Sequence, residues 1–125
     1  MVVSFRIVDR SWQSDLEFRQ APGFKKMEAE LADPLRKLLG NTPGFRGTRV
    51  IAFRPGSVIA DVEIIVDPSM NQTSIAGAKI MRTILTGQIQ QRRAIGPFTV
   101  DPTSLSISEA ERENGLSDLA FAGID

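Results

Sequence analysis

The sequence contains no cysteine, histidine or tyrosine and only one tryptophan among its 125 residues. Without cysteine, thiol nucleophiles, zinc–thiolate sites and redox switches are excluded. Without histidine, the chain has no imidazole metal ligand and no ordinary base that titrates near neutral pH. The compartment stays open, because disulfides are common in secreted proteins without being obligatory.

The chain also lacks an excess of charge of either sign, since 15 Lys and Arg residues balance 15 Asp and Glu residues. This balance argues against a nucleic-acid partner, because binding to phosphates needs clustered positive charge. No apolar run approaches the roughly 20 residues needed to span a bilayer, and the first residues lack the apolar core of a signal peptide. We therefore expect that this domain does not itself insert into a membrane. If the parent protein is secreted or membrane-anchored, we expect the sequence to be a domain excised from it.

The composition that remains is that of one folded domain. Hydrophobic residues make up 42% and charged residues 24% of the chain, a mixture typical of globular proteins. A chain of this length buries about two thirds of the surface of its unfolded form, so its core needs no metal or disulfide. Residues 109–125 are acidic, rich in small side chains and weakly periodic, which predicts a loosely ordered tail after a domain at 1–108.

Alternating or continuous apolar residues predict four strands. The first two lie at 2–8 and 48–53, and the third lies at 58–66. A last strand begins at Phe98 and is broken into two pieces by Pro102. In the third strand the apolar side chains share one face, and the other face carries Asp61, Glu63 and Asp67. We expect a solvated acidic face balanced by nearby Lys or Arg, rather than a cation site.

Apolar residues spaced by three and four predict two helices. The first helix starts near Phe24, and its apolar face consists of Phe24, Met27, Leu31, Leu35 and Leu38. Pro34 interrupts this helix, so either Asp33 caps a second helical piece or the helix kinks there. The second helix spans 72–91, where Gly77 and Gly87 each weaken it by roughly 1 kcal/mol relative to Ala. Its expected apolar face consists of Ala76, Ile80 and Ile84.

The predicted order is strand, helix, strand, strand, helix, strand. It is typical of an α+β, ferredoxin-like βαββαβ sandwich, in which two helices cover one face of a four-stranded antiparallel sheet. Because this fold carries many unrelated functions, it decides nothing about activity by itself. RNA binding, one such function, would need exposed aromatic side chains on the central strands and a basic sheet face. Asp61 and Glu63 argue against that function.

The most informative segment is the turn between the second and third predicted strands, with the sequence Phe53-Arg54-Pro55-Gly56-Ser57-Val58-Ile59-Ala60. Its Pro-Gly pair fits a type II turn of an antiparallel hairpin, with Gly56 at positive φ. The segment resembles the SEA domain family of membrane mucins, proteoglycans and agrin-like matrix proteins, whose members commonly carry Gly-Ser and three apolar residues here. Gly56, Ser57, Val58 and Ile59 match that motif, and Ala60 is smaller than the usual Val.

The resemblance covers roughly residues 3–108. The opening strand, the first helix, Gly44-Phe45 and the closing IGPFTVDPTSLSIS segment follow in matching order. It implies an extracellular module of a membrane-anchored or secreted parent protein, without a cofactor or a bound metal. Carbohydrate-rich matrix and other ectodomains are the partners that it suggests.

Many members of that family cut themselves between the Gly and the Ser, here Gly56 and Ser57. The Ser hydroxyl attacks the preceding carbonyl carbon, an N-to-O acyl shift gives an ester, and water hydrolyses it. This reaction needs no histidine, so distortion of the peptide must drive it. A barrier reduction of roughly 7 kcal/mol would accelerate the step about 10⁵-fold. The event is single-turnover autoproteolysis, so the chain is not expected to be an enzyme.

Two further expectations accompany the resemblance. The two fragments of a cut chain should stay associated, because the cut falls in a hairpin whose strands share one core. The alternative is an uncleaved spacer or protein-interaction module of a glycosylated ectodomain. Asn71-Gln72-Thr73 is the single N-glycosylation sequon, at the expected start of the second helix, so we expect a glycan on Asn71 if the parent protein is secreted.

Overall fold

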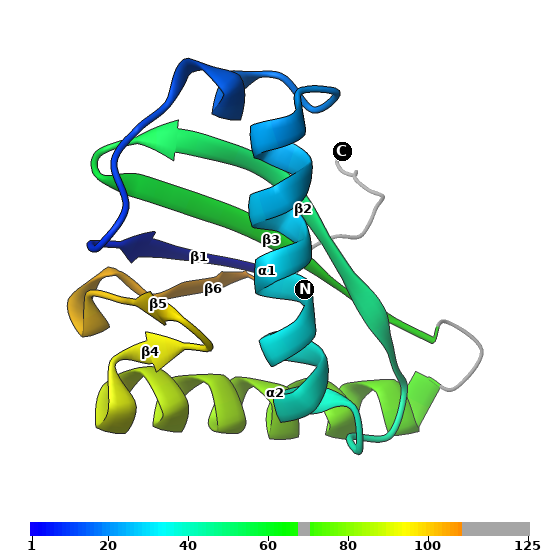
Figure 1. The fold of residues 1–125 in the computed structure, drawn as a ribbon. Helices are drawn as coiled ribbons and strands as arrows, with labels where there is room; N and C mark the ends of the chain where they lie inside the picture. Colours follow the sequence, from blue (N-terminus) through cyan, green and yellow to red (C-terminus); the bar gives the residue numbers. More distant parts are fainter. Residues whose placement is uncertain (68–70, 109–125) are drawn as a thin grey trace, which may run out of the picture.

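The four long-range strands of the protein are β1 (Val2–Ile7), β2 (Phe45–Pro55), β3 (Val58–Val66) and β6 (Ser106–Ser108). The computed structural model describes residues 1–67 and 71–108, and the predicted tail at 109–125 lies outside this part. The strands form one antiparallel sheet in the order β2-β3-β1-β6 (Figure 1). The predicted α+β architecture is therefore confirmed.

Two helices pack on this sheet, α1 (Pro22–Leu39) and α2 (Asn71–Arg92). Short elements join them to the strands: η1 (Ser14–Glu17), β4 (Ala94–Ile95), β5 (Phe98–Thr99) and η2 (Pro102–Ser104). Helix α1 runs over one side of the sheet, and α2 runs crosswise to it beside the β4–β5 hairpin (Figure 1). Within the described residues, no helix is long and apolar enough to cross a bilayer.

Helix α1 is continuous through Pro34, so the expectation that Asp33 caps a second helical piece is wrong. The carboxylate of Asp33 instead pairs with Arg36 and Lys37 on the following turn. The ring of Pro34 packs against Gly96, where an added Cβ would lie 2.7 Å from the Pro34 Cγ. Of the predicted apolar face of α1, Phe24, Leu31 and Leu35 are buried, and Met27 and Leu38 are partly buried against the core. Leu39, which was not predicted, is also fully buried.

The buried face of α2 differs from the predicted one by a single residue step. Ile80 is 44% exposed, and Ala76 lies outside the described side chains. The core face instead consists of Gly77, Met81, Leu85 and Ile89. The loop before β2 explains this rotation, because an added Cβ at Gly77 would lie 2.2 Å from the carbonyl oxygen of Pro43. Gly77 therefore permits a backbone approach that no larger residue allows.

The last predicted strand is split at Pro102, as expected. Val100 bridges to Ile7, and β6 pairs with the other end of β1 through Val2, Val3 and Ser4. Helix η2 separates these two contacts with the edge of β1. The β4–β5 hairpin was not predicted, because strands of two residues have no periodicity to detect.

Strand β2 forms one edge of the sheet, and two side chains cover the middle of that edge. Arg19 donates hydrogen bonds to the carbonyl oxygens of Val50 and Ile51 at 2.8 and 2.9 Å. The Val50 amide donates to the carboxylate of Glu28 at 3.0 Å. Open strand edges can pair with strands of other chains. These contacts occupy the backbone groups of Val50 and Ile51 and so oppose such pairing in the middle of β2.

Two substitutions in α2 test the close approach at Gly77. Gly77→Ala should lower the free energy of unfolding by about 1–3 kcal/mol, since the new methyl group must displace the backbone of Pro43. Gly87→Ala is the matched control, because an added Cβ there meets nothing within 4 Å. That control should raise the free energy of unfolding by about 0.5–1 kcal/mol. Urea unfolding measures both, and equal effects would contradict the packing at Pro43.

Candidate functional site at the β2–β3 turn

The loop between β2 and β3 consists of Gly56 and Ser57, because Pro55 pairs with Val58 across the hairpin. Both loop residues are exposed and lie at positive φ, 120° for Gly56 and 54° for Ser57. The predicted antiparallel hairpin and the positive φ of Gly56 are confirmed, but the type II turn is wrong in its position, because the loop centres on Gly56 and Ser57 rather than on Pro55 and Gly56. Two-residue hairpins favour positive φ in the loop because that geometry matches the right-handed twist of the flanking strands.

Ser57 occupies a backbone conformation that disfavours its own side chain. Among the described residues only Ser57 and Arg93 have positive φ without being glycine. This conformation costs an L residue about 1–2 kcal/mol, because Cβ approaches the following carbonyl oxygen. At Gly56 an added Cβ would meet the Cδ1 of Ile59 at 3.3 Å, besides the strain of its φ. The peptide bond between Gly56 and Ser57 therefore joins two residues that both adopt unusual backbone conformations.

The Ser57 hydroxyl makes no hydrogen bond with any residue of the described part of the chain. A serine that attacks a separate substrate needs an adjacent base to remove its proton. The surroundings of Ser57 therefore do not resemble the site of a serine hydrolase. Attack on the carbonyl of the preceding residue remains chemically open, since the nucleophile and its target are neighbours in one chain.

The strand that follows the loop is anchored in the core. Val58 and Ala60 are fully buried, and Ile59 faces the other side of the sheet and is half-buried. Ala60 lies between Phe5 of β1 and Phe53 of β2 in the cross-strand register. Two large rings thus flank the small side chain of Ala60, so the core under the loop is closed without the usual Val.

Phe53 extends this core to the helix layer. Its ring contacts Phe24 of α1 edge to face, with the ring centres 5.0 Å apart. The guanidinium of Arg19 lies over the ring of Phe24, 5.1 Å from the ring centre. The end of β2 before the loop is therefore packed against α1, and Pro55 leads from this packed strand into the loop.

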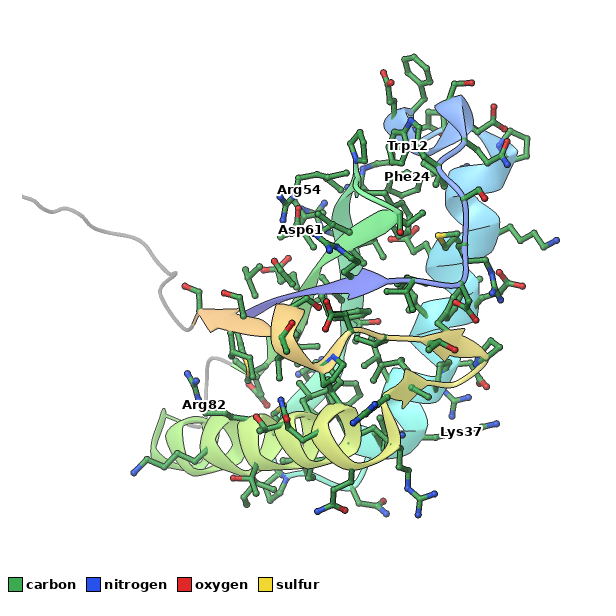
Figure 2. All side chains as sticks on the ribbon, turned by 90° about the vertical axis from the view of Figure 1, so that its left-hand side faces the viewer. Trp12, Phe24, Lys37, Arg54, Asp61 and Arg82 are labelled. Carbon is green, nitrogen blue, oxygen red and sulfur yellow. The ribbon has the colours of Figure 1, made fainter. Side chains whose placement is uncertain are left out.

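An ion pair closes the hairpin just behind the loop. Arg54 Nε donates to Asp61 Oδ2 at 2.7 Å, and Arg54 Nη2 donates to Oδ1 at 2.8 Å. The Ser4 hydroxyl of β1 donates to the same Oδ1 at 2.6 Å. Figure 2 shows Arg54 and Asp61 on the side of the sheet opposite α1. We call these three side chains the hairpin clasp, and they join β2, β3 and β1.

The clasp alters the ionisation of its members. Hydrogen bonds from Arg54 are the main cause that lowers the pKa of Asp61, and a hydrogen bond from Ser4 adds to it against the effect of burial. The hydrogen bond to Asp61 likewise raises the pKa of Arg54. Asp61 is the more enclosed partner, with 17% of its side chain exposed against 52% for Arg54.

The predicted acidic face is balanced by arginines, as expected. Besides the clasp, Arg49 pairs with Glu63 at 3.6 Å and Arg46 pairs with Asp67 at 3.5 Å. In the described ranges, no group of three His, Cys, Asp or Glu residues could hold a metal ion.

The open face of the central strands lacks the features of an RNA-binding sheet. Phe5 is the one aromatic residue of β1 and β3, and it is buried on the helix side. The face instead carries the polar clasp and the paired carboxylate of Glu63. Stacking of bases on aromatic rings, which single-stranded RNA recognition uses, has no platform on these two strands.

The sequon residue Asn71 is the first residue of α2, which confirms the expected position at the helix start. Its side chain lies outside the described side chains. The glycan therefore stays a prediction.

Strain at Ser57 can be measured in uncut protein by comparing two variants that both lack the hydroxyl. Ser57→Gly should be more stable to urea than Ser57→Ala by about 1 kcal/mol, because only glycine adopts this φ without strain. The same pair of substitutions at Ser106, in the extended strand β6, should rank in the opposite order. An identical ranking at both positions would contradict strain at the loop.

The clasp predicts an acid-dependent loss of stability. Since the folded pKa of Asp61 is below the unfolded value of about 3.9, its contribution is complete above that value and is lost as the pH falls through the folded pKa. In a Ser57→Ala background, Asp61→Asn should lower the free energy of unfolding at pH 7 by about 1 kcal/mol, and less at pH 2.5.

The matched control for the clasp is Glu63→Gln, which removes a longer and more exposed ion pair. Its effect at pH 7 should be smaller than that of Asp61→Asn. A loss for Asp61→Asn that does not change between pH 7 and pH 2.5 would show that the carboxylate charge is not responsible.

Comparison with known families supports the assignment suggested by the sequence of the β2–β3 turn. A family model described as SEA domain matches residues 1–101 of the chain, including the β2–β3 turn. No curated protein matches the sequence. The family match spans most of the chain and includes all three members of the hairpin clasp, and the structure has the antiparallel sheet and the two helices expected from the resemblance. The chain belongs to the SEA domain family.

Proposed function

We propose that the protein is an extracellular SEA module that cuts itself once between Gly56 and Ser57, after which the two fragments stay associated. The observation that carries this proposal is the backbone of Ser57. A potential nucleophile follows Gly56 directly, in an exposed loop, at a φ of 54° that disfavours a serine. The parent protein is membrane-anchored or secreted, and Asn71 carries its glycan.

The reaction is an intramolecular acyl shift followed by hydrolysis. Oγ of Ser57 attacks the carbonyl carbon of Gly56, the C–N bond breaks as the C–O bond forms, and the hydroxyl proton passes to the released amine. Water then hydrolyses the ester, which leaves a carboxylate on Gly56 and restores the hydroxyl of Ser57. The products are fragments 1–56 and 57–125, and no cofactor takes part.

The energy of the step comes from folding. The φ of Ser57 accounts for about 1–2 kcal/mol, whereas a 10⁵-fold acceleration requires roughly 7 kcal/mol. The remainder comes from distortion of the peptide between Gly56 and Ser57, which connects two strands that are anchored in the core through Phe53 and Val58. A typical domain has only about 5–15 kcal/mol of stability, so strain of this size would be a large fraction of the total. A cut that relaxes the strain therefore makes the fold more stable.

The strand order explains why the fragments would remain together. In the order β2-β3-β1-β6, the first and third strands belong to residues 1–56, and the second and fourth belong to residues 57–125. All three ladders of the sheet therefore join one fragment to the other. Separation requires the whole sheet to open, which suits a joint that releases its outer part only under mechanical load.

The second candidate function is an uncleaved spacer or protein-interaction module. One observation favours it: a two-residue loop with both residues at positive φ is a common hairpin geometry, stable without any cut. Both candidates share the extracellular location and differ only in the fate of one peptide bond.

Mass spectrometry of the purified protein separates the candidates. The self-cleaving module should give two masses that correspond to fragments 1–56 and 57–125 and elute together before denaturation. Ser57→Ala should give one intact mass, because it removes the attacking oxygen and leaves the fold in place. Ser57→Thr and Ser57→Cys should retain part of the cutting, since each supplies a nucleophile.

The serine of β6 provides the control, because Ser106→Ala leaves the loop unchanged and should cut like the parent chain. Fragments that persist in Ser57→Ala would point to a contaminating protease. A single intact mass for the parent chain would establish the spacer instead.

A further inference from the structure

A pocket of about 320 Å³ lies on the open face of the sheet, next to the hairpin clasp. Its walls come from all four strands of the sheet and from helix η2, and its lining residues are Ser4, Arg6, Arg54, Ile59, Ser104 and Ser106. Ile59 pairs with Arg6 on one side and with Arg54 on the other, so two arginines flank one apolar side chain in a single row of the sheet. Ser4 and Ser106 are paired in the neighbouring part of the sheet.

The nearby carboxylates are already occupied by other donors. Oδ1 of Asp61 accepts from Ser4 and Arg54, and Oδ2 accepts from Arg54. Oδ1 of Asp101, which lies within electrostatic reach of Arg6, accepts from the backbone amide and the hydroxyl of Thr103. The hydrogen-bonding capacity of the acceptors around the pocket is thus largely used within the protein.

The donors of the pocket are in excess. The Arg6 guanidinium donates no hydrogen bond to any residue of the described ranges, and the hydroxyl of Ser106 has no such partner there either. Arg54 binds Asp61 through Nε and Nη2, which leaves the N–H groups of Nη1. A pocket with free guanidinium and hydroxyl donors and occupied acceptors fits a ligand that supplies only acceptors, namely an oxyanion.

We infer that this pocket binds a small organic anion whose carboxylate or sulfate group lies between Arg6 and Arg54. The apolar surface of Ile59 faces the carbon skeleton of the ligand, and the Ser106 hydroxyl donates to a further oxygen. The volume exceeds that of a single ion and lies at the lower end of the range for organic ligands.

The pocket also belongs equally to both sides of the Gly56–Ser57 bond. Ser4, Arg6 and Arg54 precede this bond, and Ile59, Ser104 and Ser106 follow it. A ligand in the pocket therefore touches both fragments of a cut chain and binds only their complex. This part rests on the proposed function: by mass action, occupancy of the pocket opposes separation of the fragments.

Binding is tested first in uncut Ser57→Ala protein, so that the result does not depend on cleavage. In ¹H–¹⁵N NMR titrations, D-glucuronate should shift the signals of Ile59, Ser106 and the Arg Nε–Hε groups with a saturable curve in the millimolar range. D-glucose, the uncharged counterpart, should leave them unshifted. Inorganic sulfate tests whether the carbon skeleton of the ligand contributes: it should bind more weakly than glucuronate, because it has no carbon skeleton to pack on Ile59.

Arg6→Gln should weaken glucuronate binding about tenfold, the loss expected for one charge-assisted contact. Arg49→Gln is the matched control, because it removes the same charge from β2 at a position outside the pocket. Dispersed spectra confirm that both variants are folded. Equal affinities for the two variants, equal shifts with D-glucose, or no saturable shift in Ser57→Ala protein would overturn the site.

The coupling is tested in the parent chain after mass spectrometry has established the cut. Saturating glucuronate should slow fragment separation in moderate urea by several-fold, and Arg6→Gln should abolish this effect. Normal binding to Ser57→Ala protein with an intact parent chain would refute cleavage alone. Binding to the cut protein without slower separation would refute the coupling alone.

Discussion

The ladder between β2 and β3 is the interaction on which the rest of the structure depends. Its register pairs Pro55 with Val58 and so leaves Gly56 and Ser57 as the whole connection between two strands. The same register places Arg54 within reach of Asp61 and puts Ala60 between two phenylalanine rings. A shift by one residue would turn every side chain of β3 to the other face and would abolish the core, the clasp and the loop geometry together.

Much of this arrangement could be predicted from local patterns in the sequence. The alternation in 58–66 identifies β3 and its acidic face, and an exposed acidic face leads to the expectation of Lys or Arg nearby, which the arginine pairs confirm. The spacing of apolar residues locates both helices, and Pro102 marks the break in the last strand. These features depend on neighbours in the chain, which is why a single sequence contains them.

The features that the sequence did not reveal depend on contacts between distant segments. Pro-Gly is a local signal for a type II turn, but the pairing of Pro55 with Val58 determines that the loop consists of Gly56 and Ser57. The apolar stripes through Ile80 and Met81 are adjacent on α2, and only the contact of Gly77 with the Pro43 carbonyl selects the second. The pocket on the open face is likewise lined by residues that are far apart in the chain, so no local sequence motif predicts it.

The alternation of fragments across the sheet sets what self-cleavage would change. The cut removes one covalent connection in a two-residue loop and leaves every ladder, the core and the clasp in place. The contacts therefore stay in place, and two opposing changes remain. Release of the strain at the loop stabilises the cut fold, whereas unfolding now releases two chains instead of one, which favours the unfolded state. Stability would then depend on concentration, and at low concentration a separated pair would rarely meet again. A domain cut at this bond would resist thermal unfolding as a single fold, yet its fragments would separate irreversibly once force had opened the sheet.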